Sequence, residues 1–267
     1  MANIEAHYSA RDIETKILAA LREAGLDPEQ RLTPEELGAL DHFHTGGFGA
    51  SQRLLELSKI RAGDRVLDIG AGLAGPARML AVEPGCNVDC IELSPDYCVG
   101  ANLLNRLTGL EDRVKVYEGS ALDQPFGDNS FDAAWMQNVG MNIEDKRKLY
   151  EEVFRVLKPG GRFAFQEMAA GDSAASYYPL PWATYPTDNF LVPIEEMQSL
   201  LGESGFVSEF FEDASNPQPG GAPAPPPKVQ LSLSVYVDDL ARKADNAVRS
   251  VKEGQIKFVR GVFRADK

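Results

Sequence analysis

Val66-Leu67-Asp68-Ile69-Gly70-Ala71-Gly72-Leu73-Ala74-Gly75 is the stretch that decides the fold of this 267-residue chain. The apolar run from Arg65 to Ile69 predicts a buried parallel strand, because it lacks polar alternation. The glycines that follow predict a turn, since glycine adopts positive φ and lets the backbone approach a ligand closely. A helix is expected to begin at about Gly75-Pro76, because proline is tolerated in a first turn. Together these elements predict a nucleotide-type binding corner at the carboxyl end of a strand.

The three glycines have the spacing G-x-G-x-x-G, which fits NAD and FAD as well as other adenosyl ligands. Asp68 narrows the choice, because it stands at the end of the strand, where its charge is expected to face the ligand. A carboxylate there opposes the pyrophosphate that a dinucleotide places on the helix N-terminus. It suits a ligand with a cationic amine and a sulfonium, and the sequence therefore favours S-adenosylmethionine (SAM).

The composition limits the classes of partner. The net charge of −13 makes the chain a poor candidate for binding nucleic acid, because phosphate attraction needs a positive surface. The sequence contains no run of 18 apolar residues that would predict a membrane span, and it shows no signal-peptide pattern. We therefore expect a cytoplasmic location. The three cysteines match no zinc spacing, and we expect no metal.

The remainder of the chain predicts an α/β fold. Residues 1–60 read as an N-terminal helical cover, and residues 61–267 as the ligand-binding domain, with a proline-rich loop at 214–228 and an inserted helix at 237–252. The expected strands are 65–69, 88–92, 114–117, 131–135, 162–167, 206–211 and 256–263, and other expected helices are 11–24, 95–107, 146–157 and 194–203. Strands separated by helices of this length indicate βαβ units and a parallel sheet.

A set of short motifs resembles the class I SAM-dependent methyltransferases. They are Val66–Gly72, the acid Glu92, Glu118-Gly119-Ser120-Ala121, Phe131–Trp135 and Leu157–Gly161, and they cover about residues 60–212 in the order of that family. The resemblance implies a Rossmann-like, seven-stranded, mostly parallel sheet with helices on both faces and an antiparallel last strand.

Three further segments resemble the small-molecule branch of that family. They are Gly75-Pro76-Ala77-Arg78, the turn Asp41–Gly47 and Met141-Asn142-Ile143. Members of this branch act on quinones, tocopherols, sarcosine and related glycine derivatives, and bacterial natural products. The branch therefore does not identify one acceptor.

The resemblance also implies which residues hold SAM. Glu92 lies 22 residues after Gly70, where a carboxylate can accept both ribose hydroxyls. The other implied residues are Asp68 for the amino group, Gly70 and Gly72 at the methionine end, Leu93 and Ala121 at the adenine, and Gln137 and Asn138 at the reaction centre. Ser120 departs from the family's usual aspartate, and its hydroxyl is a weaker acceptor than a carboxylate. Gln137 and Asn138 could equally line the crevice without touching the ligand.

Residues for the acceptor are less sharply indicated. His42 and His44 are two apart and should face opposite ways in an extended segment, and we favour His44 as a general base, with His42 near the substrate. Tyr8 could close over the site. Tyr178 and Trp182, in the aromatic segment 176–190, could form an apolar wall for the acceptor or pack in the core.

The resulting hypothesis is transfer of the sulfonium methyl to a small molecule by in-line displacement, giving S-adenosylhomocysteine (SAH). A cyclase or isomerase that binds SAM without consuming it is the first alternative, because a fold does not fix a function. An NAD-dependent oxidoreductase and a non-enzymatic binding module are more remote alternatives. A homodimer is compatible with the sequence.

Overall fold

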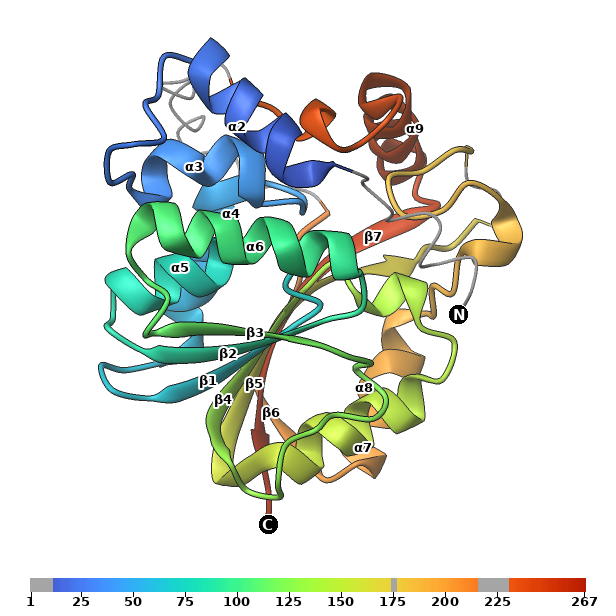
Figure 1. Ribbon diagram of the computed structural model, residues 1–267. Coiled ribbons are helices and arrows are strands. Elements are labelled where there is room, and N and C mark those ends of the chain that lie inside the picture. Colours follow the sequence, from blue (N-terminus) through green and yellow to red (C-terminus); the bar gives the residue numbers. More distant parts are fainter. Residues whose placement is uncertain (1–11, 174–176, 216–230) are drawn as a thin grey trace. The chain divides into compact units, whose positions relative to one another are not determined.

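The computed structural model of the chain describes residues 12–173, 177–215 and 231–267, and it contains a seven-stranded mixed sheet (Figure 1). The strand order is β3-β2-β1-β4-β5-β7-β6. The strands are β1 (Arg65–Ile69), β2 (Asn87–Glu92), β3 (Val114–Glu118), β4 (Phe131–Gln137), β5 (Leu157–Ala170), β6 (Phe206–Asp213) and β7 (Ile256–Ala265). Strand β7 runs antiparallel to both β5 and β6. The predicted Rossmann-like α/β fold with an antiparallel last strand is confirmed.

Three helices precede β1, and from β1 onward helices separate most of the strands, as the sequence predicts. The α-helices are α2 (Ile13–Glu23), α3 (Pro34–Asp41), α4 (Gly47–Ser58), α5 (Gly75–Val82), α6 (Pro95–Thr108), α7 (Lys146–Val156), α8 (Ile194–Glu203) and α9 (Leu240–Lys252). Short 3-10 turns are η1 (Gly140–Asn142), η2 (Pro186–Asp188) and η3 (Leu233–Val235). Among the described residues, no helix is long and apolar enough to cross a membrane.

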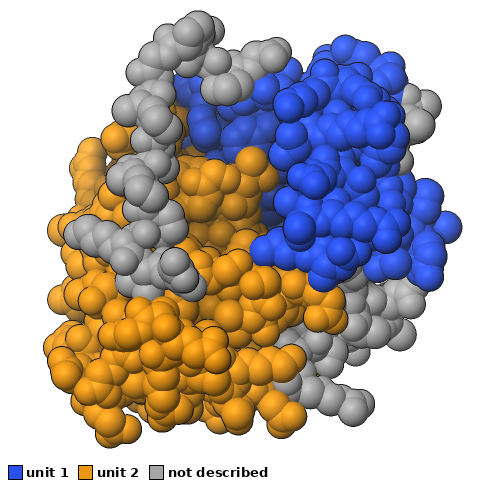
Figure 2. Space-filling view, turned by 90° about the horizontal axis from the view of Figure 1, so that it is seen from above, with its two compact units in different colours: residues 1–7, 126–222, 239–267 blue, residues 8–125, 223–238 orange. Residues whose placement is uncertain are grey.

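The chain divides into two compact units, coloured separately in Figure 2. Unit 2 comprises residues 8–125 and 223–238, and unit 1 comprises residues 1–7, 126–222 and 239–267. This division by contacts differs from the boundary at residue 60 that the sequence suggests, and the predicted domains stay a prediction.

Unit 2 contains the three parallel strands β1, β2 and β3. Helix α2 packs on α6, and α3 packs on α5. Local sequence explains the start of α3: the Thr33 hydroxyl accepts from the Glu36 amide, and the Glu36 carboxylate accepts from the Thr33 amide, which forms a capping box. The capping box thus satisfies an amide at the start of α3, and α3 ends at Asp41.

Unit 1 contains β4, β5, β6 and β7. Strand β5 is longer than the predicted 162–167, because its pairing with β7 continues to Ala170, opposite Ile256. The predicted helix at 237–252 begins only at Leu240, because Asp239 at its N-cap has a left-handed φ of 53°. Both differences come from contacts or dihedral angles that a local pattern does not contain.

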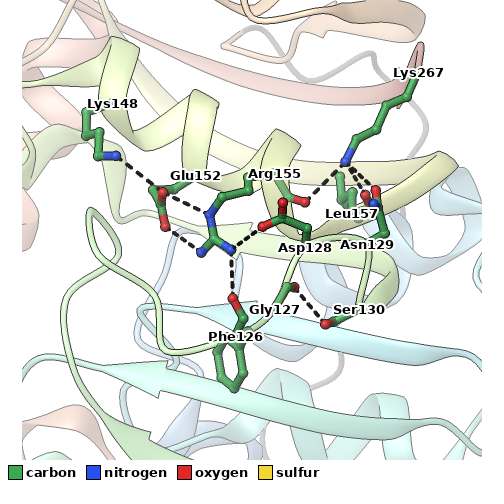
Figure 3. Close-up of polar contacts among 10 residues, drawn as sticks. All are labelled: Phe126, Gly127, Asp128, Asn129, Ser130, Lys148, Glu152, Arg155, Leu157 and Lys267. Atoms are coloured by element: carbon green, nitrogen blue, oxygen red, sulfur yellow. Dashed lines mark hydrogen bonds and ion pairs between the residues drawn. The ribbon is translucent and has the colours of Figure 1, made fainter.

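A polar network ties the end of α7 to the turn before β4 (Figure 3). The Arg155 guanidinium donates to the Phe126 carbonyl at 2.7 Å and pairs with Glu152 and Asp128. The Lys267 ammonium donates to the carbonyls of Arg155 and Leu157 and to the Asn129 side chain. These bonds satisfy carbonyls at a helix C-terminus that lack intrahelical partners.

Candidate functional site

The glycine turn after β1 has the conformation that its sequence predicts. Gly70 and Gly72 have φ of 65° and 56°, in the left-handed region that glycine enters at little cost. The Gly70 amide donates to the Ile91 carbonyl at 2.8 Å, which ties the turn to β2. Gly70 and Gly72 therefore place no side chain at the two positions of the turn that the resemblance implies lie close to the methionine end of SAM.

Glu92, the last residue of β2, holds this turn from the side. Its Oε2 accepts from the Gly72 amide at 2.8 Å, and its Oε1 accepts from the Ser94 amide at 2.8 Å. Burial nevertheless raises the pKa of Glu92 above its usual value. Each carboxylate oxygen has a second lone pair, so both oxygens can still accept ribose hydroxyls.

Asp68 is buried at the end of β1, and its Oδ2 has no hydrogen-bond partner among the described residues. Burial, and then the nearby charge of Glu92, raise the pKa of Asp68 to about 8, while Arg78 opposes the shift. An unpaired buried carboxyl group is costly, and a cation beside it would stabilise its charged form. The residues present therefore fit a cationic adenosyl ligand better than an anionic dinucleotide.

The implied adenine side of the site lies around the end of β3. The Ser120 hydroxyl accepts from the Leu122 amide at 3.1 Å, and the Ala121 carbonyl accepts from Gln124 at 3.0 Å. Leu93, Ser120 and Ala121 are all half-buried. The Ser120 hydroxyl thus shapes the loop after β3, and its predicted bond to adenine stays a prediction.

Asp41 and His42, at the end of α3, form a buried cluster with Arg78 of α5. His42 Nδ1 lies 2.7 Å from Asp41 Oδ1, and Asp41 Oδ2 accepts from Arg78 at 2.7 Å. The Arg78 guanidinium also donates to the Leu73 carbonyl in the glycine turn and to the Asn105 side chain. Burial alone would raise the pKa of Asp41, but Arg78 and His42 hold that pKa below its usual value.

His44 has a different environment. Its Nε2 lies 3.0 Å from the Ser51 hydroxyl, and burial lowers the pKa of His44 to about 3, helped by the charge of His42. The rings of His42 and His44 lie 5.5 Å apart, so the expectation that they face opposite ways is wrong. The reason is a tight turn in which the His44 amide donates to the His42 carbonyl. The role of His44 as a base stays a prediction.

In unit 1, a second cluster lies at the carboxyl ends of β4 and β5. Glu167 accepts from the amides of Val139 and Gly140 at 2.9 and 3.1 Å, and burial raises the pKa of Glu167 to about 7. Asn138 has a left-handed φ of 54°, and its buried Oδ1 has no partner among the described residues. The side-chain oxygen Oε1 of Gln137, by contrast, accepts from the Trp135 indole N–H at 2.9 Å. Asn138 is therefore the better placed of the two to receive a ligand donor.

Lys146 forms hydrogen bonds that hold the loop that follows Asn138. Its ammonium donates to the carbonyls of Gly140 and Phe190 at 2.9 and 2.7 Å and also to the Ile143 carbonyl. Burial lowers the pKa of Lys146 to about 8. The loop after β4 and the end of the aromatic segment are thus joined within unit 1.

Tyr178 and Trp182, the aromatic residues proposed to contact the acceptor, are connected by hydrogen bonds through Asn189. Trp182 donates to Asn189 at 2.9 Å, and Asn189 donates to the Tyr178 hydroxyl at 2.9 Å. Trp182 is buried in a cluster with Met141, Met168 and Phe258, against which Tyr178 packs. Their substrate role stays a prediction, and Tyr8 lies outside the described residues.

Asp41, Arg78 and Glu167 were not identified as site candidates from the sequence. Arg78 carried a usable signal, because a charged residue in the apolar helix segment Ala77–Ala81 requires a buried partner. Glu167 stands at the end of a predicted strand, as Glu92 does, and the same reasoning applies to it. Among the described residues, no group of three or more histidine, cysteine, aspartate or glutamate side chains could hold a metal ion.

Comparison with known proteins agrees with this geometry. Residues 67–165 match the methyltransferase domain family. A glycine/sarcosine/dimethylglycine N-methyltransferase from Actinopolyspora halophila is 41% identical over 46% of this chain. The match covers 22% of that protein, so the chain spans far less than two thirds of this curated relative.

Solved structures share the fold at low sequence identity. Geranyl diphosphate C-methyltransferase from Streptomyces coelicolor A3(2), solved with Mg2+, geranyl diphosphate and SAH, has a TM-score of 0.65 and 18% identity, covering 81% of this chain and 78% of its own. The cyclase SpnF has a TM-score of 0.63 and 21% identity, covering 88% of this chain and 97% of its own. Residues 67–165 thus carry a methyltransferase domain, and the resemblance of the chain to the small-molecule class I SAM-dependent methyltransferases is confirmed.

Proposed function

We propose that this protein transfers the methyl group of SAM to a small-molecule acceptor and releases SAH. The observation that carries the proposal is the pair of buried acids at the glycine turn: Glu92, which can accept ribose hydroxyls, and Asp68, whose Oδ2 has no partner. A ligand with a cationic sulfonium and ammonium stabilises the charged form of Asp68, whereas an anionic pyrophosphate does not.

The chemical step needs little from the protein beyond alignment. The sulfonium is already a good electrophile, and positioning the acceptor in line with the S–CH3 bond can lower the barrier by about 7–11 kcal/mol. Asn138, Gln137, Tyr178 and Trp182 are proposed to contact the acceptor, and His42 and His44 stay proposed as a substrate residue and a base. The atom that accepts the methyl group is oxygen, nitrogen or carbon.

Calorimetric titration of the purified chain with SAM, SAH and NAD in parallel tests the ligand. We expect SAM and SAH to bind and NAD not to bind, and binding of NAD alone would contradict the proposal. An SAH-release assay with sarcosine, dimethylglycine, a sterol and a tocopherol precursor then tests the transfer. These probes represent acceptor types of the small-molecule branch.

The likeness to SpnF keeps one rival function open. A cyclase on this fold would bind SAM without forming SAH, so SAM binding with no SAH from any acceptor, together with cyclisation of a polyene probe, would favour it. A cytoplasmic location and a homodimer remain predictions from the sequence.

A further inference from the structure

The arrangement around His42 has the form of an oriented base. His42 is 3% exposed, and its Nδ1 is fixed by Asp41 Oδ1 at 2.7 Å. Its other ring nitrogen, Nε2, is buried and has no hydrogen-bond partner among the described residues. A carboxylate that accepts from Nδ1–H leaves the lone pair on Nε2, as in triads where a third group orients the histidine.

The orienting group is itself anchored to the glycine turn. Arg78 joins Asp41 Oδ2 to the Leu73 carbonyl, which lies between Gly72 and Gly75. Gly75 makes room for the pair: a Cβ atom there would lie 2.5 Å from the Asp41 carbonyl oxygen and 2.6 Å from His42 Nδ1. The position of the Asp41–His42 pair is therefore coupled to the turn that the proposed SAM site uses.

The charged and titratable groups near His42 are Asp41 of α3, Arg78 of α5, His44 in the turn after α3, and Tyr236 after η3. Asp41 and Arg78 are described above, and the half-buried His44 ring lies 5.5 Å away. Tyr236, which follows η3, donates to the Leu40 carbonyl at 2.7 Å. None of these groups is bonded to Nε2, and the Phe48 ring packs 5.1 Å from the His42 ring.

We propose that His42 is the general base of the reaction, with Asp41 as its positioning residue, and that the acceptor carries a removable proton on oxygen or nitrogen. This inference rests on the proposed methyl transfer. The acceptor heteroatom forms a bond to the methyl carbon, the S–CH3 bond breaks with its electron pair left on sulfur, and the acceptor proton passes to His42 Nε2. An alkene acceptor, which loses no such proton before methyl transfer, would not need this pair.

Nitrogen NMR of the full chain labelled with 15N-histidine tests the state of the ring without any acceptor. The chain has three histidines, and spectra of His42→Asn and His44→Asn assign their signals. At pH 8 we expect the His42 ring to carry a proton on Nδ1 and none on Nε2. A proton on Nε2 would overturn the proposal whatever the acceptor is.

Activity with hydroxyl, amine and alkene acceptor probes gives the second readout. We expect His42→Asn to lower SAH release about 100-fold while SAM affinity in calorimetry changes less than about threefold. Asp41→Asn should lower turnover and also shift the pH–rate profile, which a purely structural role would not do. A larger loss in His44→Asn than in His42→Asn would assign the base to His44 and contradict the inference.

Arg53→Gln on α4 is the control, because Arg53 is exposed and pairs with Glu56 on the same helix. If the wild-type chain fails to bind SAM, the proposed function fails, whereas the NMR result still decides the state of His42. If His42→Asn does not fold, the spectra of His7→Asn and His44→Asn assign those two histidines, and the remaining signal of the wild-type chain belongs to His42. Turnover of only the alkene probe would also overturn the inference.

Discussion

The Gly72 amide donates to Glu92 Oε2 at 2.8 Å, so the acid at the end of β2 holds the glycine turn at the end of β1. A single carboxylate thus shapes the turn and is proposed to bind the ribose. Removing its charge affects both roles at once, which makes Glu92 a sensitive position for testing the site.

Glu92→Gln is expected to weaken SAM binding at least tenfold, or about 1.4 kcal/mol. The amide keeps the volume and one acceptor oxygen, but it cannot accept from the Gly72 and Ser94 amides and two hydroxyls together. Calorimetry with SAM measures the change. Glu83→Gln is the control, because Glu83 contacts the Gln52 side chain away from the turn. Equal affinities for the Glu92 variant and the wild type would remove Glu92 from the site.

SAM binding at pH 7 is expected to release protons. Asp68 has a pKa of about 8 in the ligand-free protein, so it is largely protonated at pH 7, and a cationic ligand lowers that pKa. The heat of SAM binding should therefore depend on the ionisation enthalpy of the buffer. SAH, which lacks the sulfonium charge, should release fewer protons. In Asp68→Asn the buffer dependence should shrink, and an unchanged dependence would show that another group supplies the proton.

The raised pKa of Glu167 predicts how the free energy of unfolding of the ligand-free protein changes with pH. The folded protein holds this proton up to about pH 7, whereas the unfolded chain releases it near pH 4.5. The folded state therefore binds more protons in this window, and the free energy of unfolding falls as pH rises through it. Glu167→Gln should flatten that decline, as measured by urea unfolding at several pH values.

Glu203→Gln is the control for that series. Arg147 lowers the pKa of the exposed Glu203, so its contribution has the opposite sign. A steeper decline in the Glu167 variant than in the wild type would contradict the assignment.

Gly75→Ala is expected to destabilise the fold by about 1–3 kcal/mol, because its Cβ would overlap the Asp41 backbone. Gly49→Ala is the matched control: Gly49 lies in α4, and nothing lies within 4 Å of a Cβ there. Alanine is the better helix former, so the Gly49 variant should be stabilised by up to about 1 kcal/mol. Chemical unfolding of both variants measures the difference, and similar values for the two would show that the close contact at Gly75 is easily relieved.

Local signals explain what was predictable from the sequence. Strand β1 and helix α8 have the predicted bounds, because glycine and proline residues mark their ends. The length of β5 was not predictable, since its last residues pair with a strand about 90 positions later in the chain. The same holds for Asp41 and Arg78, which are 37 positions apart and meet only after α3 packs on α5.

The histidine assignment shows the same limit within a short segment. A spacing of two residues predicts opposite faces only where the backbone is extended, and the backbone turns between His42 and His44. The choice between the two rings as a base depends on which one a carboxylate orients. The hydrogen bond between Asp41 and His42 shows which ring is oriented, and the order of residues does not.

The close fit at Gly75 has a consequence for protein engineering. In a G-x-G-x-x-G motif the third glycine is usually credited to the packing of helix against strand. Here the missing side chain is what admits the Asp41–His42 segment from a different helix. Grafting residues 65–82 (β1, the glycine turn and α5) without α3 onto another scaffold would leave Arg78 buried with its charge uncompensated, so a working transplant has to include α3.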